Sequence, residues 1–226
     1  MSPDATLTGL FYGWEQVITG LAQWEIRDHC YLFFPDRRVY DGLPAGGGDW
    51  TAFDFAAAER KTPTKTGRYT IDDPRIRIAW ARGRPGESGT LDRARESMKI
   101  GEITLKKVAR FNDLRLDGTF EASASGSIAA AGMPNPAGVT RVISARQLVF
   151  SHDGHCRRDA SFGVHDPHGT IVGHSSEQQG NYRIEGNSLE LDFGGERTRH
   201  TFFIDPDDED ASQPGLIVID GKKFAR

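Results

Sequence analysis

The segment GNYRIEGNSLELDF, residues 180–193, decides the fold because its pattern also occurs earlier in the chain. The earlier copy is GRYTIDDPRIRIAW, residues 67–80, and the two align without a gap. In each copy, two short runs alternate apolar and polar residues on either side of a tight polar turn. Alternation with period two is typical of a half-buried strand. Each copy therefore predicts a β-hairpin with one apolar face and one solvated face.

Further matches mark the beginning and the end of each copy. Residues 6–11, TLTGLF, are echoed by residues 115–120, RLDGTF, so that both copies open with the pattern L-x-G-x-F. Residues 98–105, MKIGEITL, match residues 217–224, IVIDGKKF, and each of these segments predicts a closing hairpin. Repetition of this kind indicates a tandem duplication of one β unit.

The chain divides into a first β repeat, residues 1–110, and a second β repeat, residues 111–226, which we expect to form one pseudo-symmetric globular unit. Their short alternating segments predict an all-β fold, an antiparallel barrel or sandwich, because closure removes unpaired strand edges. One short helix is expected at residues 54–61, DFAAAERK, since Ala, Glu, Arg and Lys favour helix. The following Thr62-Pro63 ends it.

The order of motifs is the same in both repeats. An L-x-G-x-F entry is followed by an aromatic strand ending in Pro-Asp or His-Asp-Gly, then by G-x-Y-x-I, a turn, L-x-L-x-F and a closing strand. This order resembles bacterial lipocalin-like, calycin-type β-barrel proteins, here as a tandem duplication. Gly9 and Trp14 also resemble the lipocalin G-x-W start, at a different spacing. The resemblance implies a barrel or sandwich that holds a small apolar molecule, and it implies no catalytic residue.

Composition excludes several classes of partner. The chain has 226 residues, 37% of them apolar, and a formal net charge of -4, which disfavours nucleic acid. Its apolar runs are too short to cross a bilayer, and its N-terminus lacks the basic and apolar regions of a secretion signal. Cys30 and Cys156 do not correspond between the repeats, which indicates two free thiols in a reducing compartment. We expect a cytoplasmic protein with neither nucleic-acid nor membrane partners.

Differences between the repeats indicate where function resides, because positions that match are framework. The first repeat carries Trp and titratable residues where the second carries mainly Ser, Ala and Gly. This predicts an aromatic-lined pocket in the first repeat for a small apolar or aromatic molecule. The predicted ligand-binding residues are Trp14, Trp24, Arg27 and Trp50.

Glu25, His29 and Tyr31 are the candidate catalytic residues, because alternation places them with Arg27 on one face of a strand. If this face lines a cavity, an acid, an imidazole and a phenol in one row suffice for general acid/base chemistry. The same face can instead meet solvent, which is the commoner arrangement for alternating polar residues on antiparallel strands.

The histidines do not predict a metal site. Six of the seven lie in the second repeat, and the closest pairs, His152 with His155 and His165 with His168, fall at turns. Turns do not hold ligands as rigidly as strands or helices do, so we expect no bound metal. Dinucleotide- and phosphate-binding motifs are also absent from the sequence, and we expect no cofactor.

Three functional classes remain open. The first is a protein that binds a small apolar or aromatic ligand in its barrel. The second is a cofactor-independent isomerase or cyclase that holds its substrate in a reactive conformation inside the barrel. The third is a protein-partner-binding or immunity-type protein that uses an outer sheet face. A cavity lined by tryptophans favours the first two classes, and a solid core with an exposed apolar patch favours the third.

Overall fold

The computed structural model describes the backbone of residues 6–19, 23–44, 47, 53–128, 140–166, 169–208 and 210–226. Within these ranges the side chains of residues 19, 23–24, 123–128, 140–144, 162–166 and 169–174 lie outside the description. By its contacts the chain divides into two compact units, Met1–Arg110 with Phe203–Asp207, and Phe111–Phe202 with Asp208–Arg226.

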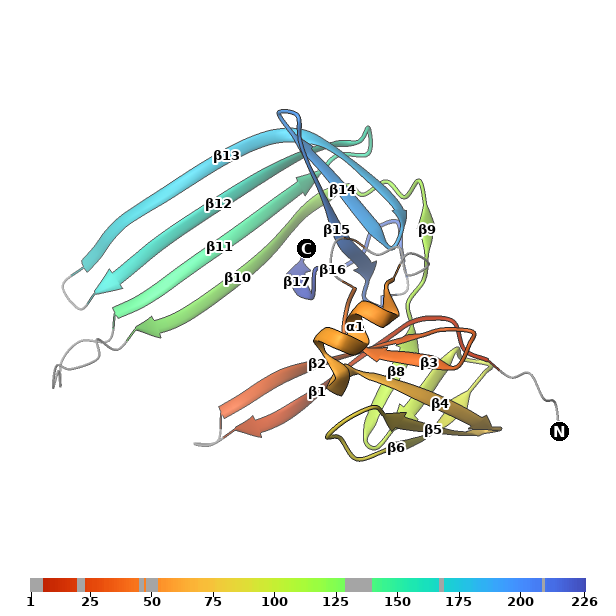
Figure 1. Cartoon of the computed structure of the whole chain (residues 1–226). Coiled ribbons are helices and arrows are strands. Elements are labelled where there is room, and N and C mark those ends of the chain that lie inside the picture. Colours follow the sequence, from red (N-terminus) through yellow and green to blue (C-terminus); the bar gives the residue numbers. More distant parts are fainter. Residues whose placement is uncertain are drawn as a thin grey trace, which may run out of the picture. The chain divides into compact units, whose positions relative to one another are not determined.

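The first unit is a closed barrel of eight antiparallel strands in sequential order (Figure 1). The strands are β1 (Gly9–Thr19), β2 (Gln23–Phe33), β3 (Arg38–Asp41), β4 (Thr66–Asp72), β5 (Arg75–Trp80), β6 (Glu87–Asp92), β7 (Ser97–Ile100) and β8 (Ile103–Lys107). The barrel closes where β1 pairs with β8, Phe11 opposite Lys107 and Tyr12 opposite Lys106. Such closure leaves this part of the sheet with no unpaired edge.

The second unit repeats this topology. Its strands are β9 (Phe111–Asn112), β10 (Gly118–Ile128), β11 (Thr140–Phe150), β12 (His155–Asp166), β13 (Gly169–Gly186), β14 (Ser188–Phe193), β15 (Glu196–Ile204), β16 (Leu216–Ile219) and β17 (Lys222–Ala225). Pairing of β12 with β13 and of β10 with β17 closes the eight strands from β10 to β17, and β9 adds to β13. The predicted all-β class is confirmed, as two closed eight-stranded antiparallel barrels in tandem.

The two hairpins that the sequence singled out have the same register. Tyr69 lies opposite Ile78 in the first barrel, and Tyr182 lies opposite Leu191 in the second. An added Cβ at Gly180 would lie 2.1 Å from the backbone oxygen of Asp192. Only glycine permits this close approach of the strands, which explains the glycine that opens the hairpin motif.

A buried tyrosine holds the entry segment of each barrel. The Tyr69 hydroxyl accepts a hydrogen bond from the backbone N–H of Leu7 at 2.8 Å and lies 2.9 Å from the carbonyl of Phe34. The Tyr182 hydroxyl makes the corresponding contacts with the N–H of Leu116 at 2.8 Å and the carbonyl of Ser151 at 3.2 Å. The motifs L-x-G-x-F and G-x-Y are therefore two halves of one interaction.

The predicted helix forms as α1 (Phe55–Lys61), preceded by its N-cap Asp54. The Asp54 carboxylate accepts a hydrogen bond from the N–H of Ala57 at 2.8 Å, and Pro63 begins a 3₁₀ turn directly afterwards. Phe55 is buried, and its ring packs edge-on against that of Phe34 with centroids 5.8 Å apart. The helix is thereby fixed to the outside of the first barrel.

Two neighbouring strands of the second unit are long. Residues 160–165 and 170–172 are parts of β12 and β13, which have 12 and 18 residues. In the first unit, β6 begins at Glu87. In Figure 1, β10–β13 run side by side as a long sheet in the second unit. In the first unit, β1 and β2 extend beyond the barrel and pair only with each other there.

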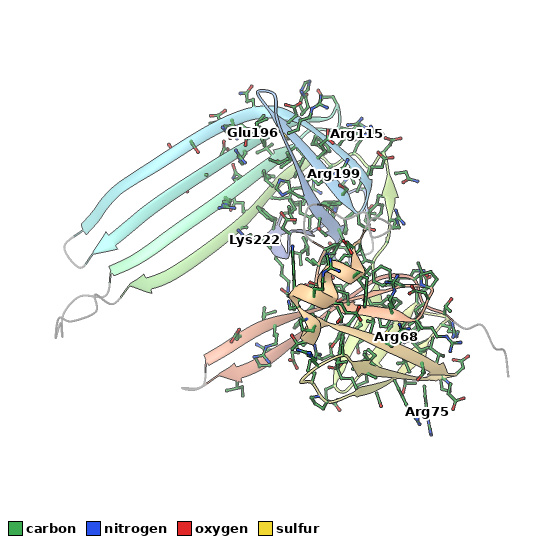
Figure 2. The ribbon with its side chains drawn as sticks, in the orientation of Figure 1. Arg68, Arg75, Arg115, Glu196, Arg199 and Lys222 are labelled. Atoms are coloured by element: carbon green, nitrogen blue, oxygen red, sulfur yellow. The ribbon has the colours of Figure 1, made fainter. Side chains whose placement is uncertain are left out.

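The core of the first barrel consists of side chains that alternate inward along its strands. Its largest members are Phe11, Tyr31, Phe33, Tyr69 and Trp80. Outward positions between them carry charge, as Arg68 on β4 and Arg75 on β5 illustrate (Figure 2). This alternation explains why the hairpin motif alone predicts which residues enter the core.

Candidate functional site

A cluster of polar and aromatic side chains lies at the end of the first barrel from which the β1–β2 hairpin extends. Tyr31 on β2 and Asp41 on β3 are directly paired, so their side chains share the inward face. Glu87 at the start of β6 pairs with Ile78 and shares that face. Trp80 ends β5, and Arg84 belongs to the β5–β6 turn. We name these five residues the barrel-end cluster.

Arg84 is the centre of the barrel-end cluster. Its guanidinium forms ion pairs with the carboxylates of Asp41 and Glu87, and it stacks 4.1 Å from the centroid of the Trp80 ring. The two carboxylates raise the pKa of Arg84, although its burial acts in the opposite direction. Arg84 is thus a cation that covers the indole face.

Tyr31 connects the polar end of the barrel to the aromatic core. Its side chain is 3% exposed, its ring centroid lies 5.9 Å from that of Trp80, and its hydroxyl donates to Glu87 Oε2 at 3.1 Å. Burial, and after it the negative charge of Glu87, raise the pKa of the Tyr31 phenol. At neutral pH Tyr31 is therefore a hydrogen-bond donor and cannot act as a base.

The indole N–H of Trp80 is a buried hydrogen-bond donor. Trp80 is 8% exposed, and its Nε1 atom has no hydrogen-bond partner within the described part of the chain. Buried donors in native proteins nearly always have partners, because an unpaired one costs about 1–3 kcal/mol. An acceptor on a bound molecule would remove that cost.

The predicted site residues are distributed over two faces of the β1–β2 hairpin. Trp14 is 47% exposed and lies on the outer face, opposite to that of Tyr31, together with exposed Ile18 and Ile26. The predictions for Trp24 and Trp50 concern side chains outside the described residues. The structure therefore does not bring Trp14 to the barrel-end cluster.

Of the row Glu25-Arg27-His29-Tyr31, only Tyr31 enters the barrel. Glu25 and Arg27 are exposed where the hairpin extends beyond the barrel, as expected for a solvated face. The solvated interpretation is wrong for Tyr31, because β3 pairs with β2 from that residue onwards and closes the barrel around it. His29 lies between, with Nε2 3.1 Å from Glu15 Oε1.

Sequence comparison of the repeats missed four members of the barrel-end cluster: Asp41, Trp80, Arg84 and Glu87. Trp80 was assigned to the framework because it aligns with Phe193, and both residues are indeed buried. The useful signal was the difference in chemistry, since tryptophan has an N–H donor that phenylalanine lacks. In the second barrel an arginine also covers the ring, Arg158 at 4.6 Å from the centroid of Phe193. Arg158 comes from β12. Arg84 instead comes from the β5–β6 turn, which corresponds to the β14–β15 turn of the second barrel.

Other kinds of site are not evident in the described part of the chain. Its His, Cys, Asp and Glu side chains form no group of three or more that could hold a metal ion. Both cysteines are free, and burial raises the pKa of Cys156 to about 11, which leaves that thiol protonated and unreactive at neutral pH. Within the described ranges, no helix has the length and apolar character needed to span a membrane.

Comparison with known proteins gives no family for this chain. It matches no protein-family model, no curated protein and no solved structure. Its function must therefore be inferred from its own residues and geometry.

Proposed function

We propose that the chain is a small-molecule-binding protein whose first barrel takes an apolar or aromatic ligand against Tyr31 and Trp80. The observation that carries this proposal is the buried indole N–H of Trp80, which has no partner among the described residues. It lies beside aromatic surface at the end of a closed barrel, where ligand sites of small barrels commonly occur. A ligand with a carbonyl or similar acceptor would satisfy the N–H while its apolar body packs on the rings.

Arg84 is the movable part of the proposed site. It belongs to a turn rather than to a strand, and its side chain is 29% exposed, so its ion pairs with Asp41 and Glu87 are partly hydrated. Partly exposed ion pairs contribute little to stability and reform easily. Displacement of Arg84 from the indole face would open the aromatic surface without disturbing the barrel strands.

The two tandem barrels support the resemblance to lipocalin-like β-barrel proteins, and we include this resemblance in the proposal. Each unit is closed by eight antiparallel strands, in the order β1–β8 and β10–β17. We propose that the two barrels arose by duplication of a lipocalin-like unit. The divergence of Trp80 from Phe193, and of Tyr31 from the corresponding Leu148, then confines the ligand site to the first barrel.

The geometry favours binding over catalysis. Glu25 is exposed, the His29 ring is engaged by Glu15, and the Tyr31 phenol is held protonated. Of the three candidates only Tyr31 belongs to the barrel-end cluster, where it donates to Glu87, so these three residues supply the cluster with a donor and aromatic surface and with no general base. An isomerase or cyclase would have to rely on shape alone.

Titration with prodan, a fluorescent naphthyl ketone with an apolar body and one carbonyl acceptor, tests the proposed function. We expect saturable binding that Trp80→Phe weakens about tenfold, because this variant keeps a ring and removes only the N–H donor. The matched control Trp14→Phe makes the same change on the exposed outer face and should bind as wild type does. Equal affinities of wild type and Trp80→Phe, or weakening by Trp14→Phe alone, would contradict the proposal.

One observation favours partner binding as a second candidate function. Trp14, Ile18 and Ile26 form an exposed apolar face on the hairpin that extends from the first barrel. Large exposed apolar side chains that cluster mark interaction surfaces. The triple variant Trp14→Ser/Ile18→Thr/Ile26→Thr removes this apolar face. Sedimentation velocity of wild type and of this variant tests self-association. Affinity capture from the host with each of the two proteins tests for binding of another protein. If neither result depends on the variant, this face is not an interface.

A further inference from the structure

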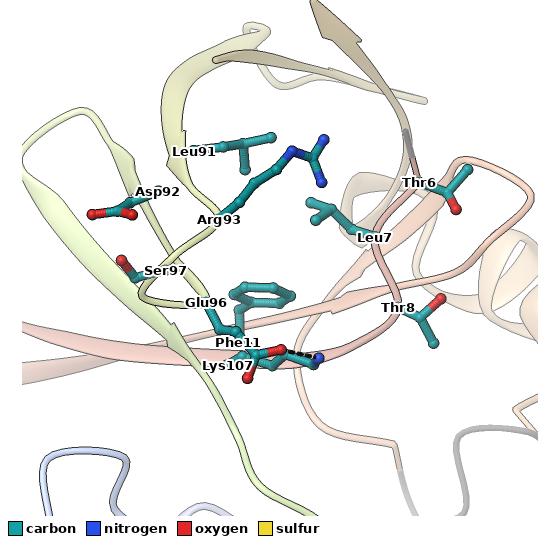
Figure 3. A pocket seen from close by; sticks show the side chains of 10 residues that line it. All are labelled: Thr6, Leu7, Thr8, Phe11, Leu91, Asp92, Arg93, Glu96, Ser97 and Lys107. Atoms are coloured by element: carbon teal, nitrogen blue, oxygen red, sulfur yellow. Dashed lines mark hydrogen bonds and ion pairs between the residues drawn. The ribbon is translucent and has the colours of Figure 1, made fainter. Parts of the chain in front are cut away.

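A pocket of about 270 Å³ lies at the end of the first barrel where the chain enters β1 (Figure 3). It is formed by three segments, the residues that lead into β1, the β6–β7 turn and the last residue of β8. The lining residues are Thr6, Leu7, Thr8, Phe11, Leu91, Asp92, Arg93, Glu96, Ser97 and Lys107. They do not include any member of the barrel-end cluster.

We name this cavity the entry pocket. Its floor consists of apolar side chains that belong to the core or pack against it. Phe11 and Leu91 are buried core residues, and Leu7 packs against the same core. Tyr69 holds the backbone of Leu7 through both its N–H and its carbonyl, at 2.8 and 3.0 Å. The floor is therefore a preformed apolar surface, which suits the body of a small aromatic or branched aliphatic molecule.

Most charges around the entry pocket neutralise one another. Lys107 Nζ and Glu96 Oε1 are 2.6 Å apart, an ion pair drawn in Figure 3. Asp92 accepts a hydrogen bond from the backbone N–H of Arg95 at 3.2 Å, and its other oxygen lies 3.6 Å from Arg95 Nε. The floor is thus surrounded by groups that form ion pairs with one another or with a nearby side chain.

Within the described part of the chain, Arg93 forms an ion pair through only one of its three guanidinium nitrogens. Its Nε lies 3.4 Å from Asp73 Oδ2, and its side chain crosses the pocket beside Leu7 and Leu91 in Figure 3. The structure shows no partner for its two terminal nitrogens among the described residues. A guanidinium presents these donors in a planar fork that fits the two oxygens of a carboxylate.

We propose that the entry pocket binds a small monocarboxylate with an apolar body, the carboxylate on Arg93 and the body on Phe11 and Leu91. Inorganic phosphate has no apolar body to place on Phe11 and Leu91, so it would not gain the contacts of the apolar floor. The volume of the pocket lies at the lower limit for ligand sites, which restricts the body to about one ring or a branched chain. This site is separate from the barrel-end cluster and does not depend on the function proposed for it.

Calorimetric titration of the whole protein with benzoate, and with benzylammonium and inorganic phosphate as comparison probes, tests this proposal. We expect benzoate to bind and the other two probes not to. Arg93→Gln should weaken benzoate binding about tenfold. Arg75→Gln, a matched change at an exposed arginine on β5, should leave it unchanged.

Three results would overturn the proposal. Absence of benzoate binding would do so, as would equal affinity for benzoate and benzylammonium. So would a benzoate affinity that Arg93→Gln leaves unchanged. The side chain of Arg93 is 43% exposed, so the glutamine variant should fold, and its far-ultraviolet circular dichroism checks this. The prodan titration depends on Trp80→Phe and not on Arg93→Gln. A negative result for benzoate at Arg93 therefore does not change the result for prodan at Trp80.

Discussion

At the scale of single residues, Tyr69 and Tyr182 have the clearest structural role. Each hydroxyl contacts both the N–H and the carbonyl of a leucine in the entry segment, and a further carbonyl at the end of the second strand of its barrel. These contacts join segments more than sixty positions apart, since Tyr69 and Leu7 are separated by 62. The sequence motif predicted a buried tyrosine and could not reveal its partners, because alternation reports the face and not the contacts.

We expect Tyr182→Phe to lower the free energy of unfolding by about 1–3 kcal/mol, because the buried N–H of Leu116 loses its acceptor. Urea unfolding followed by circular dichroism measures this. Tyr40→Phe is the matched control, since the Tyr40 ring is only partly buried and packs on Phe53 at 4.8 Å. If both variants lose the same stability, the hydroxyl of Tyr182 does not hold the entry segment.

Gly180 makes the second prediction at this scale. An alanine there would place its Cβ 2.1 Å from the Asp192 oxygen, so β13 and β14 would have to separate locally. We expect Gly180→Ala to cost about 2–3 kcal/mol in urea unfolding. Gly194→Ala is the comparison, because it has a positive φ of 66° but meets no atom within 4 Å, and backbone strain alone costs about 1–2 kcal/mol. A smaller loss for Gly180→Ala than for Gly194→Ala would contradict this steric explanation.

The residues of the candidate site were only partly predictable. Tyr31 was singled out because alternation places it with Glu25, Arg27 and His29 on one strand face, where the second repeat carries mainly Ser, Ala and Gly. The structure places it in the barrel-end cluster. Asp41 comes from β3, and Arg84 and Glu87 come from the β5–β6 turn and the start of β6, and none of them belongs to a local pattern. They meet only because barrel closure brings β3 and the β5–β6 turn to the same end, which one strand's periodicity does not encode.

At the scale of elements, α1 follows from local signals. Asp54 is its N-cap, and residues with high helix propensity fill it until Pro63. Strand lengths were less predictable. β12 and β13 continue far beyond the alternation, through segments rich in Gly, Ser and His, because each has the other as an antiparallel partner along their common length. Pairing overrides weak strand propensity there.

We expect Asp54→Ala to destabilise the protein by about 1 kcal/mol, because the N–H of Ala57 loses its capping acceptor. Asp54→Asn, which keeps a capping oxygen, should retain most of the stability. Thermal unfolding of the two variants and wild type measures the difference. Equal losses for the alanine and asparagine variants would show that the cap contributes nothing measurable.

At the scale of the whole molecule, the duplicated pattern predicted the all-β class, and the structure shows two closed barrels of eight strands each. The hairpin motif carries this information because it specifies the inward face, the register and the close approach at glycine together. How far each barrel extends, and which residues meet at each of its ends, depend on contacts between distant strands. Those features required the structure.

Alkaline pH should destabilise the protein through groups that burial keeps protonated. The pKa of Cys156 rises from its ordinary 9.0 to about 11, and burial also raises the pKa of the Tyr31 phenol. For groups with a raised pKa, the contribution to stability is complete below the unfolded value and is lost as pH rises through the folded value. We expect Cys156 alone to account for a loss of about 2 kcal/mol in the free energy of unfolding between pH 9 and pH 11.

Guanidinium unfolding at pH 8, 9, 10 and 11, for wild type and Cys156→Ala, measures this loss. The stability advantage of wild type over the variant should shrink across this range, because only wild type has the Cys156 thiol to ionise. A difference that stays constant would show that the Cys156 thiol ionises as readily in the folded protein as in the unfolded chain.

The most direct test of the proposed ligand site is the indole N–H region of a ¹⁵N-correlated NMR spectrum during titration with prodan. The four tryptophans give separate indole resonances, which single Trp→Phe variants assign. We expect the Trp80 resonance to shift as its N–H gains an acceptor, with the same dissociation constant that fluorescence reports, while the Trp14 resonance stays in place. Saturation of the protein with an unmoved Trp80 resonance, or a shift confined to Trp14, would contradict ligand binding at the barrel-end cluster.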